Sequence, residues 1–186
     1  MNEHIQSLHT QIAALEKELL KAQRDADIEP VADYTLRTPD DTPIHLHELF
    51  GNHDDLLIIH NMGKGCRYCT LWADGFVSAY PSLKTRCAFV LCSADKPSTL
   101  KAFAQQRKWN YPVVSGADCP FAREMGFASD KNEPWPGVSA FHREPDGTIM
   151  RTGCANFGPG DKFCSVWPLM ALLRDGANGW EPEAYD

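Results

Sequence analysis

The sequence predicts an α/β domain built on a central mixed sheet with helices on both faces. Short apolar runs of strand type alternate with segments of helical spacing, and a hairpin pattern follows near the end. The chain has 186 residues, a length that suits one domain with a real core. This alternation favours a mainly parallel sheet with an antiparallel hairpin at one edge.

The first segment predicts an amphipathic helix. Its apolar residues step alternately by three and four, the spacing of a coiled-coil seam. They are Ile5, Leu8, Ile12, Leu15, Leu19 and Ala22. The stripe either packs on its own domain or pairs with a second copy, and fewer than three heptads make a weak zipper alone. We therefore expect residues 1–27 to form a helix that offers a homodimer surface, and residues 28–186 to form the main domain.

The remaining elements follow in order. Strands are expected on either side of a Pro-Asp-Asp turn within 33–51, over 54–62, over 87–95, and in a hairpin over 138–153 that turns at Pro-Asp-Gly. Helices are expected over 70–80, ending before Pro81, over 97–109, around 119–127 and over 162–175.

Composition and charge narrow the classes of function. A formal net charge of -7 and a pI near 5.4 argue against nonspecific nucleic-acid binding. The polar start of the chain resembles no secretory signal, and no apolar run is long enough to cross a membrane. Seven irregularly spaced cysteines are typical of mostly reduced thiols. We expect a cytoplasmic protein whose partners are small molecules or proteins.

The stretch HNMGKGCRYCT contains the pair Cys66 and Cys69, directly after a predicted strand and before a predicted helix. A helix N-terminus stabilises a thiolate, and Lys64 and Arg67 add positive charge. We therefore predict a Cys66 pKa below the free value of about 8.5, in the range of roughly 3.5 to 7.5. Cys69, one turn further on, should be more buried and able to resolve a mixed disulfide. The pattern predicts dithiol–disulfide exchange.

Two segments, LIIHNMGKGCRYC and PGVSAF with its following hairpin, resemble the thioredoxin superfamily across most of residues 31–175. The resemblance implies a thioredoxin-like fold, and the added strands near the N-terminus are similar to those of the peroxiredoxin-like branch. The whole chain looks most like a bacterial family described only as predicted dithiol-disulfide oxidoreductases. On this match Pro136, preceded by Trp135, is the cis-proline that faces the cysteine pair and shapes the substrate groove.

The chain also departs from the thioredoxin pattern. Gly65 stands where thioredoxins have Trp, and Arg67 and Tyr68 replace the usual Gly-Pro. His60 occupies the position of the buried thioredoxin carboxylate, where it is either the proton acceptor for Cys69 or a core histidine bonded to backbone. We expect Lys64, Arg67, Tyr68 and Trp135 to contact the substrate.

Peroxiredoxins place a threonine three residues before the reactive cysteine, whereas this chain has Gly63 there. A thiol peroxidase of that mechanism is disfavoured. An acidic Cys66 thiolate can nevertheless react with peroxide to give a sulfenic acid that Cys69 resolves, so peroxidase activity stays as an alternative.

Other readings remain open. A structural zinc site needs four ligands, and the chain has one C-x-x-C pair. His45 and His47 share one face of a predicted strand. We expect this face to be exposed to solvent. Of the other thiols, Cys87 and Cys92 read as buried, and Cys119 or Cys154 offers a second redox step. A noncatalytic interaction module is a further alternative.

No organic cofactor is expected, because the chain has neither a G-x-G-x-x-G after a strand nor a Walker loop. Electrons would then come from another thiol system, such as glutathione or a thioredoxin reductase pathway.

Overall fold

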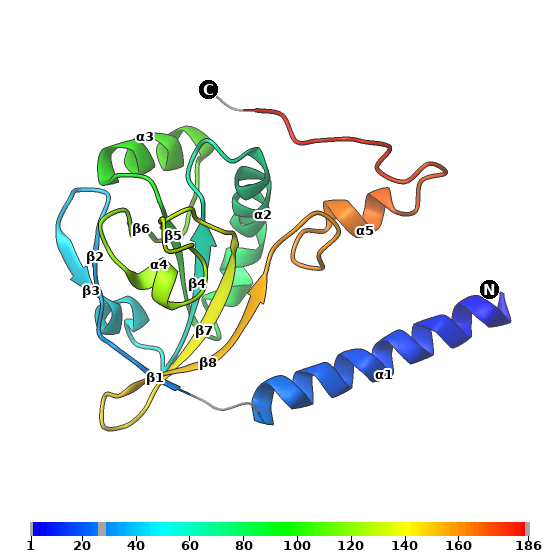
Figure 1. Cartoon of the computed structure of the whole chain (residues 1–186), viewed down its shortest axis with the longest axis horizontal. Helices are drawn as coiled ribbons and strands as arrows, with labels where there is room; N and C mark the ends of the chain where they lie inside the picture. The colour runs from blue at the N-terminus through cyan, green and yellow to red at the C-terminus, as the bar shows by residue number, and fades with distance from the viewer. Residues whose placement is uncertain (1, 26–28, 185–186) are drawn as a thin grey trace.

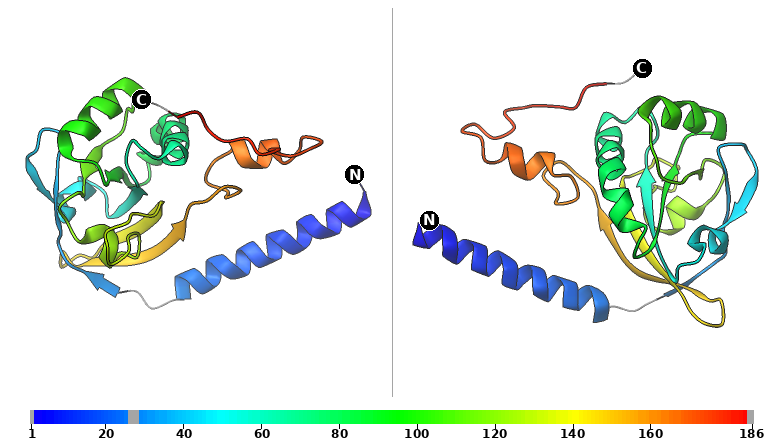
Figure 2. Two further views of the ribbon diagram at one scale, coloured as in Figure 1. Left: turned by 45° about the horizontal axis from the view of Figure 1, so that its top comes forward. Right: turned by 180° about the vertical axis from the view of Figure 1, so that it is seen from behind.

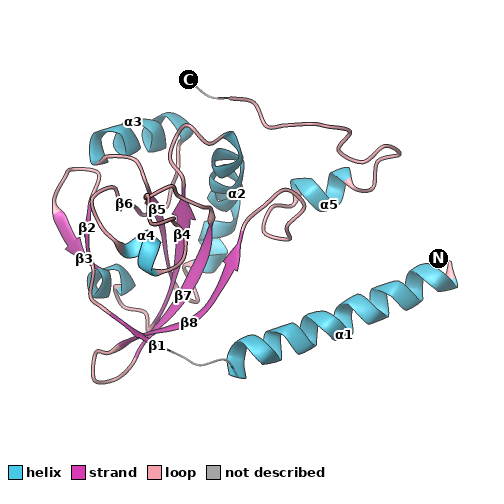
Figure 3. Ribbon diagram, viewed as in Figure 1, coloured by secondary structure: helices cyan, strands magenta, loops and turns pink. Residues whose placement is uncertain are grey.

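The computed structural model describes residues 2–25 and 29–184, and its centre is one mixed sheet (Figures 1 and 3). In this part of the chain the sheet has eight strands in the order β1-β8-β7-β4-β5-β6-β2-β3. The strands are β1 Glu29–Val31, β2 Thr35–Arg37, β3 Pro43–His45, β4 Asp55–Asn61, β5 Ala88–Ser93, β6 Val113–Ser115, β7 Gly137–Arg143 and β8 Ile149–Asn156. The helices are α1 Glu3–Asp25, α2 Arg67–Leu83, α3 Pro97–Arg107, α4 Phe121–Glu124 and α5 Val166–Met170, with a 3-10 helix η1 at Leu46–Phe50.

The mixed sheet is confirmed, but the expectation of a mainly parallel one is wrong. Strands β4, β5 and β6 pair in parallel, whereas β4 and β7, β7 and β8, β1 and β8, β2 and β6, and β2 and β3 pair antiparallel. The reason is that a hairpin extends each side of the parallel centre. Strands β1 and β6 each have only three residues. This is too few for the alternation of apolar and polar residues that identifies a strand in the sequence.

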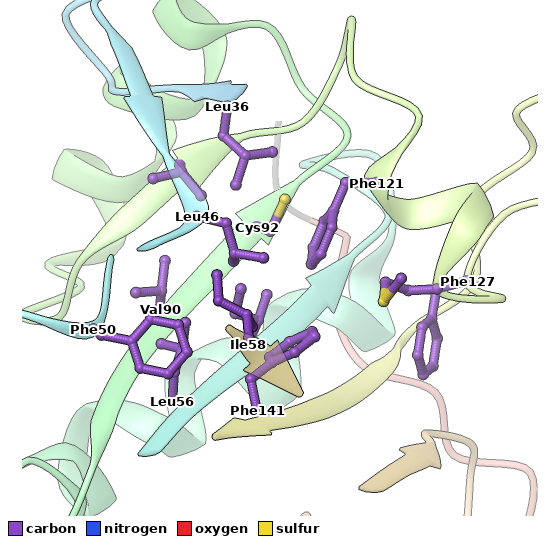
Figure 4. Packing of buried hydrophobic residues seen from close by; sticks show 13 residues of the cluster. Leu36, Leu46, Phe50, Leu56, Ile58, Val90, Cys92, Phe121, Phe127 and Phe141 are labelled. Carbon is purple, nitrogen blue, oxygen red and sulfur yellow. The ribbon is translucent and has the colours of Figure 1, made fainter. Parts of the chain in front are cut away.

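Helices cover both faces of the sheet, as expected. Side chains alternate along β4, so Ile58 joins the cluster under η1 and α4, and Ile59 joins the cluster under α2 and α3. Figure 4 shows the first cluster, in which Phe50 of η1, Phe121 of α4 and Phe141 of β7 pack around Ile58. Two apolar cores therefore hold the strands at a defined register, and the loops after β4 and β5 lie at one edge between them.

The helix α1 confirms the predicted N-terminal helix and shows that its apolar stripe is not buried on its own domain. Figures 1 and 2 show α1 projecting from the body of the molecule on the side of β8 and α5. The stripe residues are 43% to 65% exposed, and they are Ile5, Leu8, Ile12, Leu15 and Leu19. The expected domain boundary between residues 27 and 28 lies outside the described residues.

Two helix ends differ from expectation. Helix α2 continues through Pro81 to Leu83 instead of ending before the proline. Pro81 has no N–H for the carbonyl of Val77, and the side-chain amide of Asn110 donates to that carbonyl instead at 3.3 Å. This replacement bond removes part of the cost of a proline within a helix.

The last helix is much shorter than predicted. Only α5, five residues long, is helical, and the chain continues in turns. Leu172 is 82% exposed and Leu173 is 61% exposed, so the segment lacks the buried face that stabilises most short helices.

Candidate functional site

Cys66 lies at the N-terminus of α2, as the sequence predicts. It is the N-cap residue, with φ -97° and ψ 101°, and its Sγ accepts a hydrogen bond from the backbone N–H of Cys69 at 3.2 Å. A backbone bond from Cys66 N to the carbonyl of Gly63, 3.1 Å long, closes the preceding turn. The thiol therefore takes the place that a serine or aspartate side chain takes in an ordinary helix cap.

The loop before Cys66 is held by two residues that the sequence analysis did not single out. Asn61 Oδ1 accepts the N–H of Gly63 at 2.8 Å, and Asn61 Nδ2 donates to the Cys69 carbonyl at 3.4 Å. Asp95 Oδ2 accepts the N–H of Lys64 at 2.7 Å. A signal was available, because Asp95 follows β5 at the edge where β4 also ends, and parallel neighbours bring their carboxyl ends together.

Gly63 fits this loop for two reasons. Its φ is +101°, a conformation that glycine adopts readily and other residues rarely do. A Cβ added there would lie 2.7 Å from Asp95 Oδ1. A residue with a Cβ, such as the peroxiredoxin threonine, would therefore require Asp95 or the loop to shift.

The two thiols differ in acidity. The Cys69 side chain and the backbone N–H groups of Cys69 and Tyr68 donate hydrogen bonds to Cys66, which lowers the pKa of the Cys66 thiol to about 6 against the opposing effect of partial burial. The same contact with Cys66 and burial raise the pKa of the Cys69 thiol, which is 2% exposed. Both cysteines are free thiols. The hydrogen bonds stabilise one thiolate, on Cys66.

The predicted electrostatic role of Lys64 and Arg67 is not the main cause of this shift. Hydrogen bonds to the sulfur are the main cause of the lowered Cys66 pKa. The guanidinium of Arg67 forms an ion pair with Glu181. The side chain of Lys64 lies on the surface, and only its backbone N–H belongs to the loop contacts described above. The reason is geometric, because the Cys69 side chain donates to the sulfur and the backbone N–H of Cys69 lies 3.2 Å from it.

The C-terminal segment covers the first turn of α2, a contact that no spacing in the sequence reveals. Glu181 Oε2 accepts from Arg67 Nη1 at 3.0 Å, and its Oε1 accepts from the Tyr68 hydroxyl at 3.3 Å. The ring of Tyr68 stacks on Trp167 with centroids 6.2 Å apart, and Trp180 packs edge-on against Trp167 at 5.8 Å. Both residues between the two cysteines are thus held by the tail.

The structure does not bring His60 to Cys69, so the expected proton-transfer role is not supported. His60 lies on the η1 and α4 face of the sheet, where its ring stacks on Phe127 at 4.0 Å and its Nε2 lies 3.0 Å from the Ser139 hydroxyl. Burial lowers the pKa of His60 to about 3, so the ring is neutral and a weak base. Strand alternation turns the next residue, Asn61, toward α2 instead.

Pro136 and Trp135 also differ from expectation. The bond between them is trans, since no cis peptide bond occurs in residues 2–25 and 29–184. Pro136 precedes Gly137, which pairs with His60 at the end of β4, so it lies at the edge of the sheet that carries Cys66. A trans bond fits its place at the start of β7, where its carbonyl accepts from Phe157 N at 3.0 Å.

Trp135 is 51% exposed and lines a pocket of about 430 Å³ that also contains His60 and Cys119. Neither Cys66 nor Cys69 lines this pocket.

The other thiols are mostly inaccessible. Cys87, Cys92 and Cys164 are buried, as expected for the first two, and burial raises the pKa of Cys92 to about 12. Cys119 is partly exposed, and burial raises its pKa as well. Cys154 is exposed on β8. Cys66 differs from Cys87, Cys92, Cys119 and Cys164 because the pKa of its thiol is lowered, whereas burial raises theirs.

His45 and His47 lie on the surface, as expected, but they share a third neighbour. Asp33, which precedes β2, lies within ion-pair distance of both imidazoles. One donor atom from each of the three side chains lies within 4.8 Å of the other two. Among the same residues, no helix is long and apolar enough to span a membrane.

Several solved structures are similar to this fold. Peroxidoxin BcpB from Mycobacterium tuberculosis has 23% identity and a TM-score of 0.55, over 69% of this chain and 83% of that chain. Reduced Prx3 from Vibrio vulnificus, in complex with H₂O₂, has 14% identity and a TM-score of 0.57, over 72% and 88%. A mutant of peroxiredoxin Q from Xanthomonas campestris has 17% identity and a TM-score of 0.54, over 73% and 83%. This likeness confirms the predicted thioredoxin-like fold, which these peroxiredoxins share.

The search of curated proteins found no match. A match to one protein family covers residues 10–181, nearly the whole chain. The chain, which has a thioredoxin-like fold with a C-x-x-C pair at a helix N-terminus, therefore belongs to the family described as "Bacterial protein of unknown function (DUF899)".

Proposed function

We propose that the protein is a thiol–disulfide oxidoreductase in which Cys66 attacks and Cys69 resolves. One observation carries the proposal: the Cys66 sulfur caps α2 and has a pKa near 6, while its neighbour Cys69 is buried and has a raised pKa. At neutral pH the first thiol is mainly thiolate and the second is protonated. An attacking and a resolving thiol need this difference.

The proposed reaction balances within the pair and its substrate. The Cys66 thiolate attacks one sulfur of a substrate disulfide, the substrate S–S bond breaks, and one substrate thiolate leaves. Cys69 then attacks Cys66 Sγ, which breaks the mixed disulfide and forms the Cys66–Cys69 disulfide. The proton of Cys69 goes to the second departing substrate thiolate. Two electrons pass to the substrate, and an external thiol system returns them.

The substrate is proposed to approach over the first turn of α2. Arg67 is exposed and Tyr68 is partly exposed there, and Lys64 stands on the surface of the preceding loop. These side chains offer a cation and an aromatic ring beside the sulfur. A small-molecule or protein disulfide is the proposed substrate at this partly exposed surface, beside the contacts of Glu181 with Arg67 and Tyr68, and a reducing cytoplasm fits a protein with free thiols.

A thiol peroxidase is the second candidate, favoured by similarity to peroxiredoxins, one of them in complex with H₂O₂. In that reaction Cys66 attacks a peroxide oxygen, the O–O bond breaks, and water or an alcohol leaves. Cys69 condenses with the resulting sulfenic acid and releases water. The glycine at position 63 speaks against the usual peroxiredoxin arrangement, because a threonine there would collide with Asp95.

A redox titration of the purified protein in glutathione buffers tests the proposal. Oxidation of the pair is read by alkylation of the remaining thiols and intact mass. We expect a reversible two-electron transition between about -270 and -120 mV, the span of known exchange dithiols. The transition should disappear in Cys66→Ser and persist in Cys154→Ser, a change at an exposed thiol on β8.

Trapping separates the two candidates. In Cys69→Ser, oxidised glutathione should leave one glutathione on Cys66, since the resolving thiol is absent. If hydrogen peroxide forms a sulfenic acid on Cys66 rapidly and glutathione disulfide reacts only slowly, the peroxidase is favoured. A pair that forms no disulfide with either oxidant would refute both enzyme proposals and leave the interaction module.

A further inference from the structure

Three side chains with metal-binding atoms converge at the β2–β3 edge of the sheet. Asp33 precedes β2, His45 ends β3, and His47 lies in the first turn of η1. One donor atom from each lies within 4.8 Å of the other two. The sequence analysis grouped only the two histidines, because no local pattern links them to Asp33, which lies twelve residues before His45.

The carboxylate is held in place before any ion binds. Asp33 Oδ1 accepts the backbone N–H of His47 at 2.9 Å, which fixes the orientation of the carboxyl group. Its other oxygen, Oδ2, faces both imidazoles and lies 2.7 Å from His47 Nδ1 and 3.6 Å from His45 Nδ1. The two rings stack with centroids 5.6 Å apart. Asp33 Oδ2 thus lies close to both imidazole nitrogens.

These distances suit a small divalent cation. Zinc binds histidine nitrogen and carboxylate oxygen at about 2.0–2.2 Å, so neighbouring ligands of a tetrahedral ion lie about 3.3 Å apart. The His45–Asp33 separation of 3.6 Å is close to this value. The shorter His47–Asp33 contact is a hydrogen bond that an ion would replace, and a small ring movement opens it.

The surroundings leave coordination positions open. The side chains of Asp33, His45 and His47 are 42%, 48% and 52% exposed, so water has access to complete the coordination shell. The hydroxyl of Thr35 lies 3.3 Å from His45 Nδ1 and helps to hold that ring on the same side. Two imidazoles and one carboxylate form a ligand set that Zn²⁺ and Ni²⁺ accept.

We propose that Asp33, His45 and His47 form a surface binding site for a divalent transition-metal ion of the Zn²⁺ class. The site is separate from the dithiol, since β3 is the last strand on one side of the sheet and Cys66 follows the central strand β4. Binding there ties the segment before β2 to the β3–η1 turn. The ion therefore stabilises the edge hairpin and takes no part in thiol exchange.

The test must distinguish imidazole ligands from the cysteine thiols, which also bind zinc. Zn²⁺ is titrated into the protein carrying Cys66→Ser and Cys69→Ser, and nitrogen-15 imidazole NMR follows each histidine. One equivalent should shift the signals of His45 and His47 and leave that of His60 unchanged. Asp33→Asn keeps an acceptor for the His47 backbone N–H but removes the charge, so Zn²⁺ affinity should fall at least tenfold.

His9→Gln is the matched control, because His9 is an exposed histidine on α1 outside the cluster. It should leave the affinity unchanged, while His47→Gln should abolish site binding. Circular dichroism checks that each variant is folded. The proposal is overturned if the His45 and His47 signals do not move together, or if Asp33→Asn and His9→Gln bind Zn²⁺ equally well. In that case the cluster is a hydrogen-bonded surface network.

Discussion

The guanidinium of Arg67 lies 3.0 Å from the carboxylate of Glu181, a residue 114 positions further along the chain. Arg67 stands between the two cysteines, so the contact joins the C-terminal segment to the turn that carries them. It also directs the positive charge of Arg67 toward a carboxylate. The lowered pKa of Cys66 consequently comes from hydrogen bonds, first that of the Cys69 side chain and then those of the backbone N–H groups at the helix cap, rather than from its basic neighbours.

Replacing Glu181 with Gln should make Cys66 more acidic. The variant leaves Arg67 unpaired beside the thiol, which we expect to lower the Cys66 pKa by roughly a few tenths of a unit, given the high dielectric of an exposed site. The pH dependence of Cys66 alkylation, mapped by mass spectrometry, measures this shift. Glu183→Gln, a change at an exposed carboxylate two residues away, is the control. Equal curves for the two variants would contradict the prediction.

Alkylation of Cys66 should follow the ionisation of a thiol with a pKa near 6. The thiolate is the reactive form, so the rate is expected to be nearly constant above about pH 7 and to fall about tenfold for each unit below pH 6. Cys69→Ala removes the largest cause of the lowered pKa and should move the midpoint upward. A midpoint at the ordinary cysteine value in the wild type would show that the helix cap does not stabilise the thiolate.

Gly63→Ala should destabilise the protein by roughly 1–3 kcal/mol, because the new Cβ meets Asp95 at a positive φ. Urea unfolding measures the loss. Gly65→Ala is the matched control, since a Cβ there has no neighbour within 4 Å and its φ is not positive. If the two variants lose the same stability, the Asp95 contact does not restrict position 63.

Buried His60 should make stability decrease in mild acid. Its pKa is about 3 in the folded chain and about 6.5 when exposed. Between these values the unfolded state binds a proton that the folded state does not, so stability falls as the pH falls from 6.5 toward 3. The contribution of this one group approaches a slope of about 1.4 kcal/mol per pH unit. His60→Gln should reduce the slope of unfolding free energy against pH, and an unchanged slope would argue against a neutral buried ring.

The exposed stripe on α1 predicts a homodimer. Ile12 and Leu15 are 53% and 65% exposed, which is unusual for a row of large apolar side chains on one helix. Light scattering after size exclusion should give twice the chain mass for the wild type and the chain mass for Ile12→Asp. Ala13→Asp, on the neighbouring face of the same helix, should remain dimeric. A monomeric wild type at tens of micromolar would refute the prediction.

Much of this protein follows from local sequence signals. The period of Ile5 to Leu19 predicts α1, the apolar run before Asn61 predicts β4, and the position of Cys66 after that strand predicts a thiol at a helix start. These features depend on residues a few positions apart, so the spacing along the chain is enough to detect them. The family resemblance rests on the same local stretches.

Other features depend on contacts between distant residues, which spacing does not encode. The sequence analysis proposed that His60 accepts the proton of Cys69. Alternation along β4 instead turns His60 to the opposite face of the sheet and Asn61 toward α2. Asp95 and Glu181 contact the region around the two cysteines, although they lie 29 and 115 residues after Cys66 in the sequence.

The same distinction explains the histidine pair and the proline. Asp33 joins His45 and His47 only because the β2–β3 hairpin folds back beside it. Pro81 lies within α2, where Asn110, from another part of the chain, supplies the hydrogen bond to the Val77 carbonyl that Pro81 cannot. The local sequence pattern determines whether a residue lies in a helix or a strand. The face of the strand on which it lies and its long-range hydrogen bonds determine which residues surround it. The chemistry of a site depends on these surrounding residues.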